Sequence, residues 1–207
     1  MSVKSLSRKV LQAEATRESL EITARRLFGS QGYAETSLDA IAAEAGVTKG
    51  AVYHHFSDKE ELFRRVFQTV KRELSSELAR VLPDPDPWTG ILSACQRYLE
   101  IHTDPAVQRI VLLDARSVLS LDAWREVDSE WGAVMFRGAF RRAMNRGVMV
   151  PLPLNVLAMV VTGALMEACL IVANAKDPGA ARVEALTVVE QLLEGLRVSD
   201  PPNTRSG

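Results

Sequence analysis

The stretch that decides the fold is residues 36–63, which read TSLDAIAAEAGVTKGAVYHHFSDKEELF. A short helix is expected to start at Thr36 and to stop at Gly46, because glycine commonly follows the last turn of a helix. Thr48 is expected to cap a second, very short helix that reaches about His55. Two short helices joined by a glycine turn have the outline of a helix-turn-helix.

Capping signals open the helices on either side. Asp39, three residues after Thr36, fits an acidic variant of the capping box. Residues 57–60, Ser-Asp-Lys-Glu, form a full capping box that predicts a long helix from about Lys59 to Val81. Upstream, apolar residues at i, i+4, i+7 and i+8 predict a helix that ends near Gly29 or Gly32. These apolar residues are Leu20, Ala24, Leu27 and Phe28.

The run Pro83-Asp84-Pro85-Asp86-Pro87 is the strongest internal boundary, because proline lacks an amide donor and disfavours helix in the residue before it. Strand signals are nearly absent, so the expected fold class is all-α. Further helices are expected at about 88–103, 105–115, 122–147, 153–175 and 179–197. The expected domains are a flexible basic arm (1–12), a helix-turn-helix domain (13–60) with a connecting helix (59–82), a larger helical domain (83–198) and a disordered tail (199–207).

Composition excludes several classes of protein. Of 207 residues, 47% are hydrophobic and 25% charged, which is ordinary for a globular protein and excludes disorder outside the ends. The net charge is −1, and residues 1–60 carry eight basic and eight acidic side chains, so a nucleic-acid surface would have to be local. Two cysteines and a polar N-terminus without an apolar core region favour a cytosolic protein.

The second short helix carries the pattern typical of a helix that reads DNA. Val52 and Phe56, four residues apart, are the inward anchors, and Gly50 and Ala51 are small enough for a close approach to the major groove. The outward side chains are almost all donors that could reach phosphates or bases. These donors are Thr48, Lys49, Tyr53, His54 and His55.

At these residues the sequence resembles the tetracycline-repressor (TetR) family of bacterial transcriptional regulators. The resemblance covers about residues 15–65 and rests on residues 36–63, on Gly32-Tyr33 and on the preceding helix, which ends Arg26-Leu27-Phe28. It implies a DNA-binding domain, a long connecting helix and a helical effector domain of variable sequence. The protein is then expected to bind a palindromic DNA operator as a homodimer, as a repressor, and to release it when a small molecule binds.

The resemblance also implies roles for single residues. Those expected to face the operator are Thr48, Lys49, Gly50, Tyr53 and His54, and Ala51 joins them because it is small. Tyr53, Lys59 and the start of the first short helix, Thr36 and Ser37, match positions that contact phosphate. His55 matches a position that often touches the backbone, although it could partly pack inward. The alternatives are a metal or catalytic pair made by the two histidines, and a half-buried core role for Tyr53.

Candidate effector contacts lie beyond the proline run. An acid within an apolar helix must be paired or serve a site, so Glu167 is expected at the effector pocket or in a buried network. Large soft side chains and a few polar ones accompany it, with ordinary core packing as the alternative. The pocket candidates are Tyr98, His102, Arg116, Trp131, Met135, Met166 and Glu167. No cofactor, metal or catalytic residue is expected. The two cysteines are expected to be buried free thiols, and a metal or redox sensor built from Cys95, His102 and Cys169 is the weaker alternative.

The last two long helices carry more apolar surface than one core contact needs. Residues 153–175 and 179–197 are therefore expected to pair with their copies in a second chain as a four-helix interface, with a well-covered monomer as the alternative.

A membrane span over residues 156–173 is a further alternative, which Glu167 opposes. An enzyme and a helical protein-binding module are the other function classes; no nucleophile–base pair, metal spacing or phosphate loop supports the enzyme.

Overall fold

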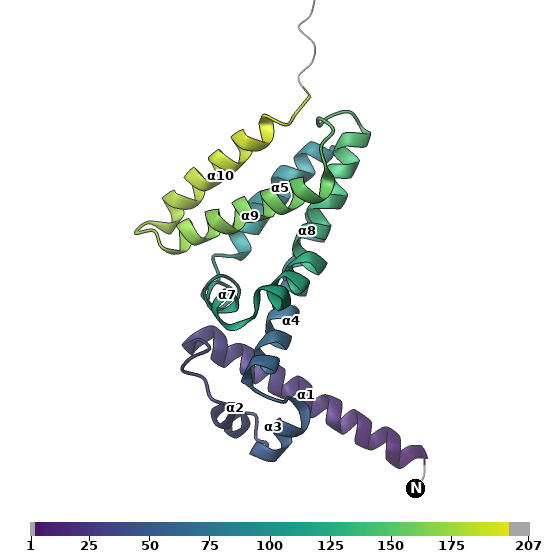
Figure 1. The fold of residues 1–207 in the computed structure, drawn as a ribbon, viewed down its shortest axis with the longest axis vertical. Helices are drawn as coiled ribbons and strands as arrows, with labels where there is room; N and C mark the ends of the chain where they lie inside the picture. Colours follow the sequence, from purple (N-terminus) through teal and green to yellow (C-terminus); the bar gives the residue numbers. More distant parts are fainter. Residues whose placement is uncertain (1–2, 199–207) are drawn as a thin grey trace, which may run out of the picture. The chain divides into compact units, whose positions relative to one another are not determined.

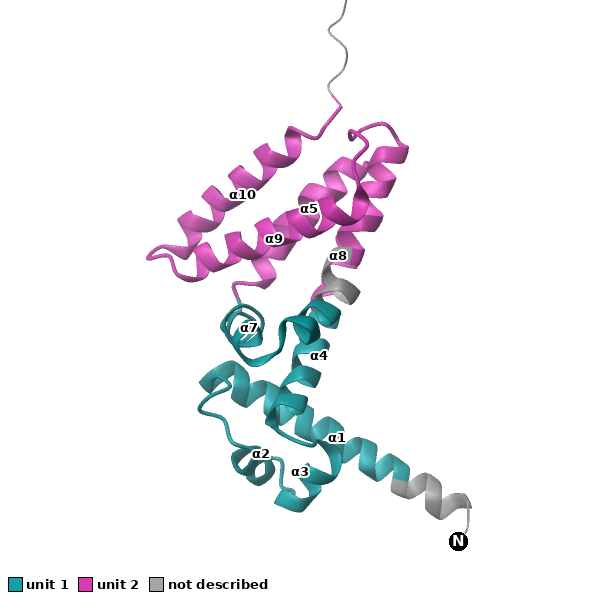
Figure 2. Ribbon diagram, in the orientation of Figure 1, with its two compact units in different colours: residues 1–72, 104–127 teal, residues 73–103, 128–207 magenta. Residues whose placement is uncertain are grey.

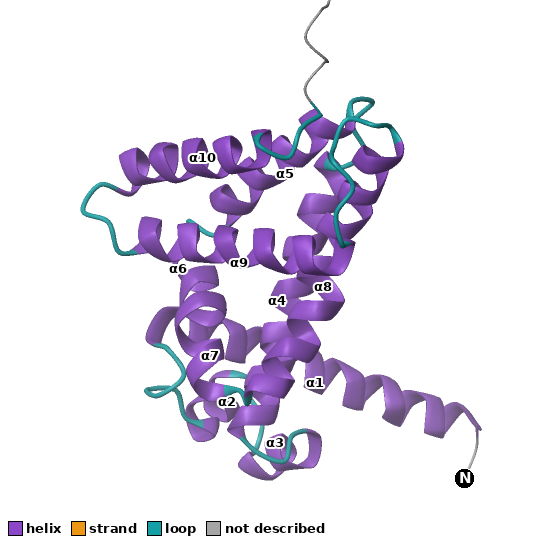
Figure 3. Ribbon diagram, turned by 45° about the horizontal axis from the view of Figure 1, so that its top comes forward, coloured by secondary structure: helices purple, strands orange, loops and turns teal. Residues whose placement is uncertain are grey.

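The computed structural model describes the backbone of residues 3–198 and the side chains of residues 10–127 and 134–198. The described part of the chain folds into ten α-helices and one π-helical segment, joined by loops (Figures 1 and 3). The all-α fold expected from the sequence is confirmed. The chain packs as two compact units, residues 1–72 with 104–127 and residues 73–103 with 128–207 (Figure 2).

The first unit holds the helix-turn-helix. Its elements are α1 (Val3–Gln31), α2 (Leu38–Glu44), α3 (Lys49–His55), the start of α4 (Lys59–Val81), α6 (Pro105–Val107), the π-helix η1 (Gln108–Asp114), α7 (Ala115–Val118) and the start of α8 (Leu121–Asn145). Aromatic rings pack its centre: the rings of Phe28 and Phe63 meet edge to face with centroids 5.2 Å apart, and Tyr33 stacks on Phe28 at 5.7 Å. Such pairs add specific geometry to apolar burial.

The end of α1 lies against α6 and η1. A Cβ atom added at Gly29 would stand 2.6 Å from the Cβ of Ala106, so the two helices touch where only glycine fits. Gly32 follows with a φ of +87°, a left-handed conformation that favours glycine. The backbone amide of Tyr33 then donates a 2.8 Å hydrogen bond to Oδ2 of Asp114. Residues 104–114 therefore pack against the end of α1 and are hydrogen-bonded to the loop that follows it.

The second unit is built from the end of α4, from α5 (Pro87–Ile101), from the rest of α8 and from α9 (Leu154–Ala173) and α10 (Pro178–Glu194). The proline run ends α4 as predicted, and Asp86 caps α5 by accepting from the amides of Trp88 and Thr89 at 3.1 and 3.2 Å. Helices α5, α9 and α10 pack on one another. Among the described residues, α9 is the one helix long and apolar enough to cross a membrane, and 39% of its most apolar window is buried.

Several local expectations were wrong. Ser37, not Thr36, caps α2, because its hydroxyl accepts from the amide of Ala40. The capping box of α4 is shifted by one residue: Asp58 accepts from the amide of Glu61, whose carboxylate accepts from the amide of Ser57.

Larger-scale expectations also differ from the structure. Residues 3–12, expected as a flexible arm, continue α1, and the helix expected at 105–115 divides into α6, η1 and α7. The two packing units divide within α4 instead of at the proline run, and they assign residues 104–127 to the first unit. The expected tail at 199–207 lies outside the described residues.

Candidate nucleic-acid interface

Helix α3 is held by its own cap and by two buried anchors. The hydroxyl of Thr48 accepts from the amide of Ala51 at 3.2 Å, so the predicted N-cap is confirmed. Val52 and Phe56 are fully buried, as their spacing predicted. Because these anchors fix the inner face of the helix, the side chains on its other face are turned to solvent.

The outward face of α3 combines small and donor side chains. Tyr53 is 51% exposed, and Lys49 and His54 are also exposed, so the alternative that Tyr53 belongs to the core is wrong. A Cβ atom at Gly50 would meet only the Thr48 hydroxyl, at 3.9 Å, which leaves the backbone open to a close partner. Ala51 is half-buried beside it.

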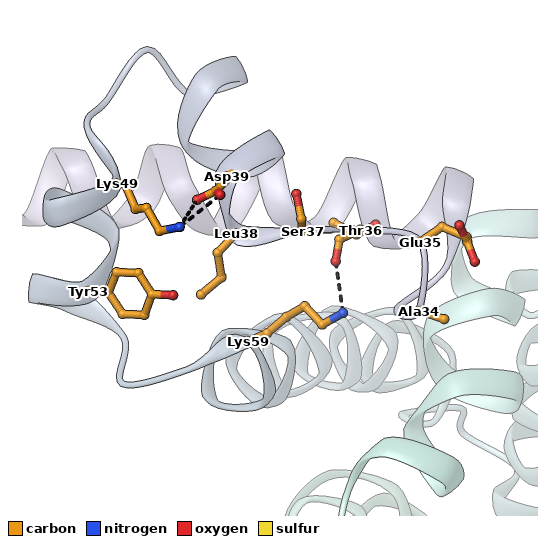
Figure 4. Close-up of a pocket in the computed structure, with 9 residues that line it drawn as sticks. All are labelled: Ala34, Glu35, Thr36, Ser37, Leu38, Asp39, Lys49, Tyr53 and Lys59. Carbon is orange, nitrogen blue, oxygen red and sulfur yellow. Dashed lines mark hydrogen bonds and ion pairs between the residues drawn. The ribbon is translucent and has the colours of Figure 1, made fainter.

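A shallow hollow of about 340 Å³ lies beside this face and is called the α2–α3 hollow (Figure 4). Figure 4 shows Lys49 and Tyr53 from α3, Asp39 from α2 and Lys59 from α4 around it. Its lining residues are Ala34, Glu35, Thr36, Ser37, Leu38, Asp39, Lys49, Tyr53 and Lys59. The hollow is therefore lined by five of the residues predicted to contact DNA, together with the carboxylates of Glu35 and Asp39. The five are Thr36, Ser37, Lys49, Tyr53 and Lys59.

Lys49 is ion-paired across the hollow. Its Nζ lies 2.9 Å from the carboxylate of Asp39, and both side chains remain about 60% exposed, at 60% and 62%. The hydrogen bond and the charge of Asp39 raise the pKa of Lys49 above its usual value. The sequence pattern predicted only a capping role for Asp39. It did not reveal the pairing with Lys49, because the ten residues between them include a turn whose geometry is set by tertiary structure.

Lys59 has an internal role that the sequence did not reveal. Its Nζ donates to the carbonyl oxygens of Tyr33 and Thr36 at 2.9 and 3.0 Å and lies 4.1 Å from the centroid of the Tyr33 ring. An ammonium has three donors, so two of them are already used. Lys59 therefore stabilises the loop before α2 through these hydrogen bonds.

Thr36 and Ser37 take different positions. Thr36 is 1% exposed and its hydroxyl donates to the carbonyl of Gly32 at 2.8 Å, so its side chain is not available to DNA, contrary to expectation. Ser37 is exposed, and its hydroxyl serves the α2 cap. The sequence could not separate the two because both adjacent hydroxyls are suitable caps.

The two histidines lie at the end of α3. Their rings are 5.2 Å apart and nearly perpendicular. Partial burial, followed by the charges of His54 and Arg17, lowers the pKa of His55, as expected for a ring that packs partly inward. Among the residues whose side chains the structure describes, no three His, Cys, Asp or Glu residues gather as a metal site.

The expected effector residues fall in both units of the chain. Tyr98, His102 and Met166 are buried in the second unit, where the rings of Tyr98 and His102 stack with centroids 4.2 Å apart. Met135 is half-buried. Arg116 belongs to the first unit, where its guanidinium lies 5.3 Å from the Trp124 ring centroid. The side chain of Trp131 lies outside the described residues.

Glu167 is exposed, so the expectation of a buried network was wrong. It lines an apolar groove of about 370 Å³, here called the α9–α10 groove. The groove is lined by Ala164, Glu167, Ala168, Ile171, Ala181, Glu184, Ala185, Val188, Val189 and Leu192. The acid was misassigned because α9 is apolar on nearly every side, which hides from the sequence which face is covered.

Both cysteines are buried and neither forms a disulfide. Burial raises the pKa of Cys95 to about 12, so its thiol is protonated at neutral pH. A protonated, buried thiol is a poor nucleophile and a poor metal ligand, which disfavours the sensor alternative.

Family models match both the N-terminal and the C-terminal part of the chain. The model of the bacterial regulatory proteins of the tetR family matches residues 23–66, and a tetracyclin repressor-like C-terminal domain model matches residues 88–196. A solved TetR-family transcriptional regulator from Pectobacterium atrosepticum is 34% identical with a TM-score of 0.79, covering 92% of this chain and 98% of that one.

Curated relatives match over shorter stretches. The HTH-type transcriptional regulator AcrR of Shigella flexneri is 47% identical over 30% of this chain and 30% of its own length. The transposon Tn10 TetC protein of Escherichia coli is 29% identical over 56% of this chain and 57% of its own length. The chain thus spans between about a third and just over half of these curated relatives.

Proposed function

Because this chain belongs to the TetR family of bacterial regulatory proteins, we propose that it is a sequence-specific DNA-binding transcriptional regulator. It binds a palindromic operator as a homodimer, acts as a repressor and leaves the operator when a small-molecule effector binds to its C-terminal domain. It works in the cytoplasm and catalyses no reaction. The observation that carries this proposal is the outward face of α3, where small residues and exposed donors stand opposite two buried anchors.

Base reading is assigned to the first turns of α3. A recognition helix enters the major groove with its N-terminal end at the base edges. Gly50 and Ala51 permit that approach, and Lys49 can donate to guanine O6 and N7. Thr48 combines its cap with a contact to the DNA backbone.

Phosphate contacts surround this centre. Tyr53 and His54 are exposed donors on α3, and Ser37 stands at the start of α2. His55 contributes at most a neutral donor near pH 7, since its pKa is lowered. The role proposed for Lys59 is chiefly to position the loop that carries Ser37, with one remaining donor for phosphate.

The dimer is proposed to form through α9 and α10. Val183, Val188 and Leu192 on α10 are each more than half exposed, as are Met159 and Val160 on α9. Apolar surface of this extent commonly marks an interface. A second copy would cover it and bury the α9–α10 groove.

The effector site is proposed around the buried Tyr98–His102 pair in the second unit. Met166 and Met135 are soft side chains suited to a small organic molecule. Arg116 and Glu167 are no longer proposed as pocket residues, since Arg116 packs with Trp124 in the first unit and Glu167 is exposed on the groove.

The test is an enrichment of duplexes from a random pool by the purified protein, followed by fluorescence anisotropy on the enriched sequence at two salt concentrations. A palindrome should emerge, and Lys49→Ala should weaken its binding. Lys176→Ala, which removes the same charge from the loop between α9 and α10, is the matched control and should bind like the wild type. A pool that yields no preferred sequence would overturn the proposal.

A further inference from the structure

An acidic side chain stands where a DNA backbone would approach. Asp39 lines the α2–α3 hollow, its side chain is 62% exposed, and it is paired with Lys49 at the start of α3. Figure 4 shows the pair at one end of the hollow, with the Tyr53 ring beside it. A carboxylate facing phosphates is repelled by them, so its presence calls for an explanation.

Stability does not explain the pair. Both side chains are mostly exposed, and exposed ion pairs contribute little to folding. The cap of α2 is already supplied by Ser37. What Asp39 does change is the charge that the hollow offers to a ligand.

The hollow has two lysines, and both are restrained. Lys59 donates to two carbonyl oxygens, so it is held in the loop before α2. Lys49 is neutralised locally by Asp39. A lysine whose charge is already neutralised displaces no counterion from DNA when it meets a phosphate. Because counterion release supplies nearly all of the affinity for random DNA, such a lysine adds little to that affinity.

Resting on the proposed function, we propose that Asp39 is a specificity-determining residue for operator recognition. It withholds Lys49 from phosphates and holds the ammonium at the start of the recognition helix, where its remaining donors can meet a base edge. Random DNA gains little from a lysine held in this way, whereas an operator with an acceptor at the right base keeps its contact. Discrimination between operator and random DNA thus comes partly from weaker binding to random DNA.

The test compares Asp39→Asn with the wild type on the enriched operator duplex and on a random duplex of equal length, over a series of salt concentrations. The asparagine keeps the shape and removes the charge. Affinity for random DNA should rise about three- to tenfold, and the slope of log affinity against log salt should steepen by about one, as for one added phosphate contact. The operator should gain less, so the ratio of the two affinities should fall at least about threefold.

Glu35→Gln is the matched control, because it removes the same charge from the lining of the same hollow and leaves the Asp39–Lys49 pair intact. It should change both affinities by one factor and keep their ratio. In a Lys49→Ala background, Asp39→Asn should no longer lower the ratio, since Asp39 acts through Lys49. Circular dichroism confirms that each variant is folded.

Two results would overturn the inference. The first is an Asp39→Asn variant with an unchanged ratio of operator to random affinity. The second is an equal fall in the ratio with Lys49 absent, which would mean that Asp39 acts by general repulsion. Failure of the proposed function is visible separately, because the wild type itself would then show no preference between the two duplexes.

Discussion

The α2–α3 region and the α9–α10 face use opposite chemistry on their surfaces. Around α2 and α3 the exposed side chains are mostly polar, and many have a nearby partner: Lys49 with Asp39, Ser37 with its own helix, Glu61 with Ser57. On α9 and α10 large apolar side chains are at least 56% exposed. These side chains are Val156, Met159, Val160, Ile171, Val183, Val188 and Leu192. We propose that the polar surface binds DNA and that the apolar surface packs against its copy in a second chain.

The largest expected effect tests that contact. Val188→Glu places a carboxylate on the exposed face of α10, where the isolated chain tolerates it. In a dimer the charge would be buried without a partner, which costs about 3–5 kcal/mol and raises the dissociation constant more than about 100-fold. Sedimentation should give twice 22.8 kDa for the wild type and 22.8 kDa for the variant. Gln191→Glu, which changes a side chain of the same helix that is already polar and exposed, should stay dimeric.

A second effect tests how tightly the first unit is packed. Gly29→Ala forces a Cβ to within 2.6 Å of Ala106, so the helices must separate. Overpacking of this kind costs about 1–3 kcal/mol, measured by urea unfolding. Gly138→Ala on α8 is the control, because its nearest neighbour is a flexible Arg142 nitrogen at 3.9 Å, and it should be neutral or stabilising. Equal stability of the two variants would refute the close contact at Gly29.

A third effect decides which residue caps α4. Asp58→Ala removes the acceptor for the Glu61 amide and should destabilise the protein by about 1 kcal/mol. Glu60→Ala should cost almost nothing, although the sequence pattern made Glu60 the partner in the capping box. The thermal midpoints of the two variants should therefore differ, and the reverse order would restore the capping box predicted from sequence.

The smallest effect is a pH dependence. The pKa of His55 is lowered in the folded protein, so the unfolded chain binds a proton first as the pH falls below about 6.5. Stability linked to His55 is thus fully present above that pH and is lost below it. His55→Gln should lose less thermal stability than the wild type between pH 7.5 and pH 5.5. An identical loss in both proteins would show that His55 does not carry the linkage.

The sequence predicted best what is decided locally. Thr48 caps α3, and Val52 and Phe56 anchor it, because caps and helical spacing depend on neighbours within one turn or two. The order of the helices followed in the same way, with most ends within about two residues. Two errors, at the starts of α2 and α4, were choices between adjacent residues able to make the same bond.

The features that the sequence did not predict depend on contacts between residues that are far apart along the chain. The partners of Lys59 are carbonyl oxygens 23 and 26 residues away, and the partner of the Tyr33 amide is 81 residues away. No periodicity encodes such distances. Likewise, Glu167 was placed in the interior because an apolar helix does not reveal which of its faces is covered. The π-helical turn of η1 was missed for a similar reason, since it deviates from the regular period.

The two buried thiols have a practical consequence for spectroscopy. Cys95 and Cys169 are the only cysteines in the sequence, and both are shielded from solvent. With a pKa of about 12, Cys95 presents almost no thiolate to a maleimide at neutral pH. A cysteine introduced at an exposed position such as Gln191 or His54 would then be labelled in preference to the native pair. Fluorophores or spin labels could therefore report on the recognition helix and on α10 in a protein whose interior remains unaltered.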